Sequence, residues 1–421
     1  MALYRVAVSV YFFLLRLAAV YSDKARKRVR GGRAAVPYLR SHGVGEKDVI
    51  WVHCASLGEY EQAKPLLVAL RRRYPARSLL LTFFSPSGYE QVQDAAPADF
   101  VCYLPDDRPG AVRRFLDAAR PRLAIFVKNE LWFGYLQELH RRDVPVFYVS
   151  SVFGERHYLT RPWAVSLLPL LHGVRGISLQ DETSCTVLKR LGLSRVVVTG
   201  DTRVDGVLAD YAAGREYDFL RVWSGQNVLV FGSIWPSDEK VFLPSLETLG
   251  ASGWRFIVAP HDVGERNVQR LLRQLGDGVV RFSDLPAGRA ELTSADRVVL
   301  VDTIGHLKYL YRYATVAYIG GGFLRSGIHN TLEPAVYGVP LIFGPRYEKF
   351  VEAVYFVRNG GARVLNCRQA GIARCRRQFA QAMACYSDAG QREAAGRVLH
   401  AYMNAGRGAT DKILSMLEKY L

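Results

Sequence analysis

The sequence lacks the motifs that define several common classes of protein. Its six cysteines form no C-x-x-C pair and have no histidine at zinc-binding spacing, and no acidic metal cluster is apparent, so neither a metal nor another cofactor is expected. It has no nucleic-acid-binding module, no dense basic stripe with interleaved aromatics and no short repeat, so no nucleic-acid partner is expected. Free thiols in a reducing cytoplasm are expected for Cys54, Cys102, Cys185, Cys367, Cys375 and Cys385.

The composition is that of a globular protein with an excess of positive charge. Hydrophobic residues make up 49% and charged residues 23% of the 421 residues, and a chain of this length is expected to form two domains. The net charge is +17, and residues 1–33 contribute +7 of it because they hold eight Lys or Arg and one Asp. An anionic lipid or a phosphorylated substrate fits this distribution better than nucleic acid does.

The amino terminus has the composition of a membrane anchor. Residues 2–21 are nearly all apolar and are about as long as a bilayer core when helical, although Arg16 lies too deep for a comfortable isolated span. The segment is expected to span the membrane with strain or to lie in its interface, and the basic cluster at 24–33 favours the cytoplasmic side. A cleaved signal peptide and an amphipathic helix packed on the domain are the alternatives.

From about residue 48, short apolar runs alternate with helical patterns. Such runs suit strands buried on both faces of a parallel sheet, and the rhythm restarts after a polar passage around 212–226. We therefore expect an α/β fold of two doubly wound, Rossmann-like domains facing across a cleft, at 34–215 and 216–421, and we allow for a last helix that crosses back. The expected strands are 49–54, 79–83, 123–127, 144–149 and 196–199, then 228–232, 255–259, 298–301, 316–319 and 341–343.

Two glutamates follow expected strands at their carboxyl ends, where ligands bind in such sheets. Glu59 stands at the start of an expected helix, whose positive end keeps a carboxylate ionised, as a general base requires. Glu130 follows the strand at 123–127, where desolvation by Trp132 would raise its pKa and Lys128 would lower it. A structural role in a first helical turn or a cap is the alternative for both glutamates.

A run of three glycines, Gly320 to Gly322, ends the strand at 316–319, and a helix opens soon after it with Asn330 and Glu333. Glycine lets a ligand approach the backbone, and a helix start presents unpaired N–H groups, so an anion such as a nucleotide phosphate is expected near Gly321 and Gly322. The glycines do not spell G-x-G-x-x-G, which argues against a nicotinamide site. Tight packing at the turn is the alternative.

Further polar residues lie near expected strand ends in both halves. Ser233 and the N–H groups beside it follow one strand, and His261 follows another, where an imidazole can donate to a phosphate. Asn330 and Glu333 have the spacing of a capping box, although Glu333 would alternatively accept the hydroxyls of a ribose. Arg203, between the halves, is expected to stabilise an anionic donor or to form a hinge salt bridge.

Several stretches, taken in order, resemble the 3-deoxy-D-manno-octulosonic acid (Kdo) transferases. They are WVHCASLGEYEQAKPL, YLPDDRPGAVRRFL with RPRLAIFVKNELW, GDTRVD, GSIWPSDE, and VDTIGHLKYLYRYATVAYIGGGF with GIHNTLEPAVYGVPLIFGP. The resemblance covers residues 45–365 approximately. It implies a metal-independent GT-B glycosyltransferase that moves Kdo from CMP-Kdo to a lipid A precursor, with inversion, on the cytoplasmic face of the inner membrane during lipopolysaccharide synthesis.

The resemblance also implies roles for single residues. Glu59 would be the general base, and Glu130 matches the second important acidic residue of the family. The residues that match the CMP-Kdo site are Ser233, His261, Gly321, Gly322, Asn330 and Glu333. Asn129 and Phe133 depart from the usual Thr or Ser and Pro, and residues 327–331 depart from Gly-Gly-His-Asn-Pro, which puts loop shape and acceptor preference in doubt.

Two other functions are compatible with a two-domain α/β chain. A nucleotide-sugar epimerase shares the expected architecture but needs neither a membrane anchor nor a basic lipid-facing surface. A non-catalytic lipid-binding protein with a nucleotide sensor is the third alternative. Turnover of a nucleotide sugar without lipid would identify the epimerase.

Overall fold

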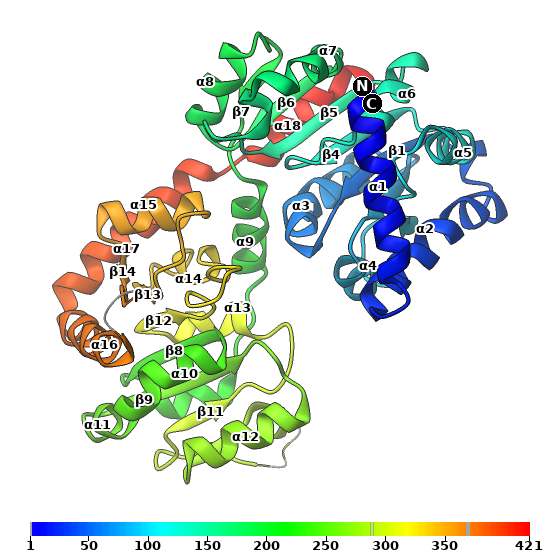
Figure 1. Cartoon of the computed structure of the whole chain (residues 1–421). Coiled ribbons are helices and arrows are strands. Elements are labelled where there is room, and N and C mark those ends of the chain that lie inside the picture. The colour runs from blue at the N-terminus through cyan, green and yellow to red at the C-terminus, as the bar shows by residue number, and fades with distance from the viewer. Residues whose placement is uncertain (1, 287, 289, 368–370) are drawn as a thin grey trace. The chain divides into compact units, whose positions relative to one another are not determined.

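A computed structural model describes residues 2–286, 288, 290–367 and 371–421 (Figure 1). The chain folds into two compact units: unit 1 comprises Met1–Gly206 and Gly406–Leu421, and unit 2 comprises Val207–Ala405. The boundary lies inside the helix Thr202–Ala213, earlier than the expected division at 215/216. The sequence gives no sign of it because the helical pattern continues unbroken across the boundary.

Unit 1 is built on a seven-stranded sheet in which every described pairing is parallel. Alternate residues of its central strand face two separate cores, since Trp51 packs with Phe115 and Phe126 while Ile50 and Val52 face the opposite side. The strands, in sheet order, are β3 (Phe100–Tyr103), β2 (Ser78–Phe83), β1 (Val49–Cys54), β4 (Leu123–Val127), β5 (Val146–Ser151), β6 (Gly176–Leu179) and β7 (Val196–Val198).

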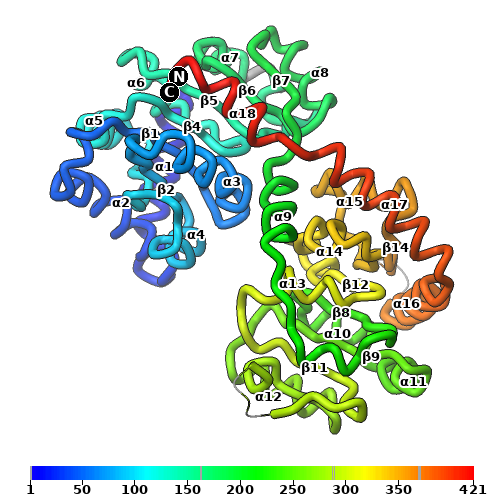
Figure 2. Tube along the Cα trace, turned by 180° about the vertical axis from the view of Figure 1, so that it is seen from behind, coloured from blue at the N-terminus to red at the C-terminus, as the bar shows by residue number. Residues whose placement is uncertain are grey.

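The helices of unit 1 cover both faces of this sheet (Figure 1). They are α1 (Ala2–Ala18), α2 (Asp23–Ser41), α3 (Leu57–Arg73), α4 (Pro86–Val92), α5 (Pro109–Ala119), α6 (Phe133–Arg141), α7 (Leu168–His172), α8 (Glu182–Arg190), the start of α9 (Thr202–Ala213) and α18 (Ala409–Leu417). Helix α18 belongs to unit 1 because the chain returns after unit 2 (Figure 2). Its Ile413, Leu414 and Leu417 complete one of the two cores.

Unit 2 is built on a second seven-stranded sheet, again with only parallel pairings among the described residues. In sheet order the strands are β10 (Val279–Arg281), β11 (Val298–Leu300), β9 (Trp254–Pro260), β8 (Asn227–Ile234), β12 (Val316–Ile319), β13 (Leu341–Phe343) and β14 (Ala362–Val364). The helices are α10 (Pro236–Phe242), α11 (Leu246–Ala251), α12 (Glu265–Leu275), α13 (Leu307–Leu310), α14 (Leu332–Ala335), α15 (Val351–Asn359), α16 (Gly371–Ser387) and α17 (Ala389–Gly406).

The α/β class and the two doubly wound sheets are confirmed, and the strands expected at 49–54, 123–127, 316–319 and 341–343 have those bounds. Four strands were not expected: β3, β6, β10 and β14. Each of them has four residues or fewer, and β6, β10 and β14 contain a Gly, Ser or Arg that interrupts the apolar run. The equally short β13 was expected because Leu341–Phe343 is entirely apolar.

The strand order places a topological switch point in each sheet. In unit 1, β1 lies between β2 and β4, and in unit 2, β8 lies between β9 and β12. At such a point the loops that leave neighbouring strands diverge to opposite faces and open a crevice at the carboxyl edge. The loops after β1 and β4, and those after β8 and β12, are therefore the ones positioned to bind ligands.

The amino terminus forms two helices rather than one long apolar helix. Helix α1 ends at Ala18, and α2 begins at Asp23 with Ser22 as its N-cap. Seventeen residues give a helix of about 25 Å, which is shorter than a bilayer core of about 30 Å. Across the described residues, no helix combines the length and the apolar character needed to span a membrane, so the spanning anchor expected from the sequence is not supported.

Helix α1 is held on unit 1 by a hydrogen bond to a buried carboxylate. Tyr4 Oη donates to Asp107 Oδ2 at 2.5 Å, and the same carboxylate accepts from the backbone N–H groups of Gly134 and Tyr135 at 3.0 and 2.8 Å. Tyr4 Oη also accepts from the N–H of Phe133. The first turn of α6 therefore receives its caps from two distant segments instead of from its own N-cap residue.

One cysteine pair differs from the expectation of free thiols. Cys367 and Cys375 are joined by a disulfide, whereas Cys54, Cys102, Cys185 and Cys385 are free. The spacing of this pair matches no recognised pattern, so the sequence alone did not reveal it.

We predict that Tyr4→Phe loosens α1 without unfolding unit 1, because the substitution leaves a buried carboxylate without one of its donors. A hydrogen bond to a charged group contributes about 1.5–3 kcal/mol, so amide hydrogen exchange in α1 should accelerate by at least tenfold. Tyr11→Phe is the control, because no described residue bonds to that hydroxyl. Equal exchange rates in the two variants would contradict this role of Tyr4.

Candidate functional site

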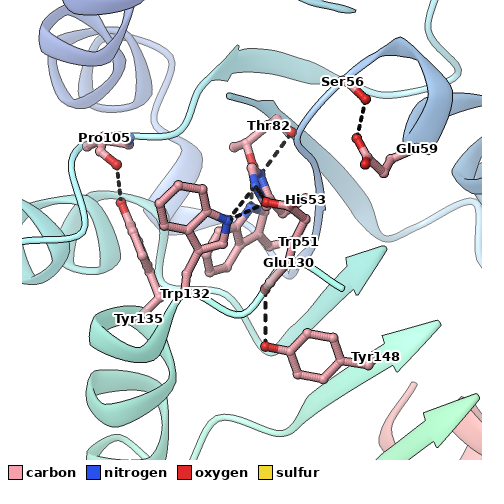
Figure 3. Close-up of polar contacts among 10 residues, drawn as sticks. All are labelled: Trp51, His53, Ser56, Glu59, Thr82, Pro105, Glu130, Trp132, Tyr135 and Tyr148. Atoms are coloured by element: carbon pink, nitrogen blue, oxygen red, sulfur yellow. Dashed lines mark hydrogen bonds and ion pairs between the residues drawn. The ribbon is translucent and has the colours of Figure 1, made fainter. Parts of the chain in front are cut away.

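The first acidic candidate lies directly after β1 (Figure 3). Glu59 occupies the first turn of α3, and Ser56, the N-cap residue of that helix, donates its hydroxyl proton to Glu59 Oε2. The half-buried carboxylate thus has one oxygen oriented by Ser56 and the other oxygen without a hydrogen bond among the described residues. A carboxylate in this state is suited to accept a proton from a bound hydroxyl.

The second acidic candidate lies after β4, in a loop whose backbone is tightly constrained. Lys128 has a positive φ of 62°, which is uncommon for a residue with a side chain. The amide of Asn129 holds the loop by bonding both the N–H and the C=O of Val152. Tyr148 Oη donates to the carbonyl of Glu130 at 3.2 Å. Asn129, a departure from the usual family residue, thereby fixes the loop that carries Glu130.

Burial decides the protonation of Glu130. Its side chain is 21% exposed, and this burial, together with the charge of Glu59, raises its pKa to about 7. The hydrogen bond from Trp132 Nε1 at 2.9 Å and the charge of Lys128 act in the opposite direction and are outweighed. The negative charge of Glu59 therefore disfavours ionisation of Glu130, which titrates near neutral pH.

A buried histidine, which the sequence did not single out, completes this arrangement (Figure 3). Trp132 Nε1 lies 3.1 Å from His53 Nε2, and because an indole nitrogen only donates, the imidazole accepts there. Its proton is then on Nδ1, which faces the carbonyl and hydroxyl of Thr82 at 3.1 and 2.9 Å. Burial lowers the pKa of His53 to about 3, so this ring is neutral and orients the indole that contacts Glu130.

Arg203 lies in the first turn of α9 and is paired with its neighbour. Its Nε and Nη2 donate to Asp201 Oδ2 at 2.8 and 2.5 Å, and its backbone N–H donates to Asp201 Oδ1. The alternative expected for Arg203 was a hinge salt bridge, and the salt bridge that it forms is to Asp201, two residues away in unit 1. Contact with a donor stays a prediction.

In unit 2, the glycine run after β12 packs closely against neighbouring backbone. A Cβ on Gly320 would lie 2.3 Å from the carbonyl oxygen of Ser233, and one on Gly322 would lie 2.5 Å from Gly344. Gly321 has a φ of 86°, and its N–H donates to Asp238 Oδ2 at 3.0 Å. These contacts match the packing alternative, and they occupy the Gly321 N–H that was expected to face an anion.

A stack of aromatic rings lies beside this turn. The rings of Trp235 and His261 are 4.5 Å apart, and those of His261 and His329 are 4.6 Å apart. Trp235 Nε1 donates to His329 Nε2 at 2.9 Å. Burial lowers the pKa of both imidazoles, that of His329 to about 4, so both are neutral at neutral pH. His261 would therefore offer a phosphate one N–H rather than a charge.

The helix expected to begin with Asn330 and Glu333 is a single turn, α14, and therefore carries little dipole. Asn330 Oδ1 accepts from the N–H of Leu332 at 3.0 Å, and Asn330 Nδ2 donates to Glu333 Oε1 at 3.1 Å. Asn330 therefore caps the start of α14 through its carbonyl oxygen and bonds Glu333 through its amide N–H. Ser233 has a positive φ of 53°, at an irregularity in the pairing of β8 with β9.

The expected residues thus form two separate groups. Glu59 and Glu130 lie at the switch point of unit 1, and the donor candidates other than Arg203 belong to unit 2. Ser233, which was expected after a strand, lies inside β8, and the others follow β9 or β12. Sequence reasoning missed His53, Asp238 and His329, whose signal was only a polar residue within or beside an apolar run. Within the described residues, no group of three His, Cys, Asp or Glu is placed to hold a metal ion.

Comparison with known proteins supports one family. Residues 25–206 match the family model of the 3-Deoxy-D-manno-octulosonic-acid transferase (kdotransferase). The 3-deoxy-D-manno-octulosonic acid transferases of Haemophilus influenzae and Bordetella pertussis are 27% and 28% identical to this chain, and each match covers 88% of this chain and 87% of the relative. The family model over the first half and these relatives over most of the chain together support the Kdo transferase family.

Solved structures agree on the fold. UDP-GlcNAc 2-epimerase from Neisseria meningitidis superimposes with a TM-score of 0.58 at 13% identity, over 88% of this chain and 100% of that one. MurG from Acinetobacter baumannii has a TM-score of 0.55 at 13% identity, over 89% and 99%. The two parallel sheets and these neighbours support a GT-B fold for the chain.

We predict that two substitutions shift the pKa of Glu130 in opposite directions. Glu59→Gln removes a like charge and should lower that pKa from about 7, whereas Trp132→Phe removes a hydrogen bond to the ionised form and should raise it. Carbon-detected NMR titration of labelled glutamate side chains measures both shifts. Shifts in the same direction, or none, would show that these neighbours do not control Glu130.

Proposed function

We propose that the protein is an inverting glycosyltransferase that moves Kdo from CMP-Kdo to a lipid A precursor during lipopolysaccharide synthesis. The observation that carries the proposal is the pairing of Glu59 with Glu130 at the switch point of unit 1, in a chain of the Kdo transferase family. One carboxylate there has an oxygen available as a base, and the other titrates near neutral pH.

The reaction breaks the bond between the anomeric carbon of Kdo and the phosphate of CMP. A hydroxyl of the lipid attacks the opposite face of that carbon, its proton passes to Glu59, and CMP leaves with the bonding electron pair. Negative charge grows on the hydroxyl oxygen as the new bond forms, so a general base that removes the proton accelerates the step by about 10²–10⁴-fold. Ser56 keeps the carboxylate oriented while it accepts the proton.

Glu130 limits the charge of the acidic pair. With a pKa of about 7 it is partly protonated at neutral pH, so the site carries less repulsion than two ionised carboxylates would. In its protonated form Glu130 donates a hydrogen bond to a hydroxyl or carboxylate of the bound sugars. His53 and Trp132 keep its side chain at the β4 edge of the sheet.

The donor is proposed to bind at the switch point of unit 2. The proposed contacts are Ser233, His261, Gly321, Gly322, Asn330 and Glu333. Neutral His261 supplies an N–H to the phosphate, and the stacked rings of Trp235 and His329 hold it in place. Arg203 would assist only if a donor phosphate competes with Asp201 for its guanidinium.

We predict that Glu59→Gln lowers the rate of Kdo transfer by about 10²–10⁴-fold while CMP-Kdo still binds. The assay combines CMP-Kdo with a tetra-acylated lipid A precursor and detects the product by mass. Glu61→Gln, two residues further along α3, is the matched control and should retain activity. Full activity of Glu59→Gln would remove Glu59 from the base role, and conversion of a nucleotide sugar without lipid would identify an epimerase instead.

The proposed location is the cytoplasmic face of the inner membrane, with α1 lying in the interface. Phe12 is the buried residue of this helix, while its apolar side chains on the outer face are exposed. They are Leu3, Val6, Val10, Tyr11, Phe13, Leu14 and Leu17, and the turn that follows adds Val20 and Tyr21. Basic α2 comes next, and together they have the two features that hold an interfacial helix on anionic lipid.

We predict that Phe13→Ser with Leu17→Ser weakens binding to anionic vesicles by about tenfold or more, because two apolar side chains no longer enter the interface. Val68→Ser with Val165→Ser, which alters two exposed valines elsewhere in unit 1, is the control. Vesicle co-sedimentation measures both variants. Unchanged binding of the α1 variant would reject interfacial attachment through this helix.

A further inference from the structure

A cavity of about 320 Å³ in unit 1 has charged lining side chains that are mostly positive. It lies where α1, α2 and the start of α5 meet, and neither catalytic glutamate lines it. Its charged lining consists of four arginines and a single carboxylate: Arg16, Arg33, Arg108, Arg114 and Asp106. The cavity therefore has an excess of positive charge that its own residues do not neutralise.

The single carboxylate is already shared. Asp106 Oδ2 accepts from Arg16 Nη2 at 2.7 Å and from Arg108 Nη2 at 2.9 Å. Arg108 Nε is buried, and no described residue accepts its hydrogen bond. Arg33 and Arg114 have no ion-pair partner in the described part of the chain. Several guanidinium donors are thus left for a ligand.

A fifth guanidinium lies behind the cavity wall. Arg28 is 2% exposed, and none of its three guanidinium nitrogens has a hydrogen-bond partner among the described residues. Its charge contacts the rings of Phe84 and Phe12, at 4.3 and 5.7 Å, which offsets part of its desolvation. A Cβ on Gly32, a residue of the cavity wall, would lie 2.4 Å from Arg28 Nη1. A buried cation without a bonded counter-charge is costly, and an anion in the cavity would lower that cost.

The backbone adds to the same field. Helix α5 spans eleven residues from Pro109, and its first-turn residue Ala111 lines the cavity together with Arg114. Pro109 has no N–H, and the N–H groups of Ala111 and Val112 donate to the carbonyl of Arg108, so the helix start contributes its partial positive charge rather than free N–H groups. The arginine side chains and the start of α5 therefore both favour a negatively charged ligand.

We propose that this cavity is a binding site for a phosphate monoester or diester carried by a lipid. Planar guanidinium groups bond phosphate oxygens in pairs, and a phosphate offers enough acceptors for several of them at once. Two sources supply this chemistry: the phosphorylated lipid acceptor, in which case the site rests on the proposed function, and an anionic phospholipid of the bilayer, in which case it does not.

The test compares two double variants. The cavity variant carries Arg33→Ala and Arg114→Ala, and the control variant carries Arg40→Ala and Arg72→Ala. All four arginines are exposed on unit 1 and have no side-chain partner among the described residues, so both variants lose the same charge and both should fold. Only the first pair lines the cavity. Phosphatidylcholine vesicles doped with phosphorylated lipid A precursor, or instead with phosphatidylglycerol, serve as probes in co-sedimentation at fixed ionic strength.

We expect the cavity variant to bind at least one of these vesicles about tenfold more weakly than the control variant. Selective loss on the precursor vesicles identifies the acceptor phosphate as the ligand, and the KM for that acceptor should then rise about tenfold with kcat unchanged. Loss on both, or on phosphatidylglycerol alone, identifies a bilayer phosphate. Equal binding by the two variants on both vesicles overturns the site. Because binding is measured without turnover, a failure of Kdo transfer by the wild type would reject the proposed function and leave this result standing.

Discussion

The indole N–H of Trp132 is the interaction on which the acidic pair of unit 1 depends. It donates to Glu130 and to a neutral histidine, His53, which Thr82 fixes from the next strand. Each partner is buried, so each has few other positions available. The protonation of Glu130 near neutral pH follows from this burial and from the charge of Glu59. The protonation of Glu130 at the sheet edge therefore depends on its burial, on Glu59 and on the indole of Trp132.

The same loop is anchored to the amino terminus. Trp132 is followed directly by α6, whose first N–H groups are bonded by Asp107 and Tyr4. Tyr4 belongs to α1, the helix that we place in the membrane interface. The proposed attachment of α1 to a membrane would thus be linked to the position of Glu130 through one buried carboxylate, Asp107. The arginine-lined cavity also involves α1, together with α2 and the start of α5.

Unit 2 uses buried polar groups differently. Asp238 bonds Trp235, Tyr318 and Gly321 and so ties the loop after β8 to the glycine turn after β12. The glycines permit close backbone contact at that crossing, and they give a phosphate fewer free N–H groups than their number implies. A donor bound there would depend on the neutral imidazole of His261 and on hydroxyl and carboxylate contacts.

Local sequence patterns determined the α/β class, most central strands, the turn positions of Glu59 and Glu130, and the family. They succeeded because buried parallel strands need continuous apolar runs, and the residues after them reach the carboxyl edge whatever the loops do. Patterns failed for four short strands, for the end of α1 and for the disulfide. Only the tertiary structure showed that burial outweighs the charge of Lys128 in setting the pKa of Glu130, and that Asp238 accepts the N–H of Gly321. It alone showed that the Arg28 guanidinium has no hydrogen-bond partner among the described residues. Those properties depend on desolvation and on partners tens of residues away, and a linear pattern contains neither.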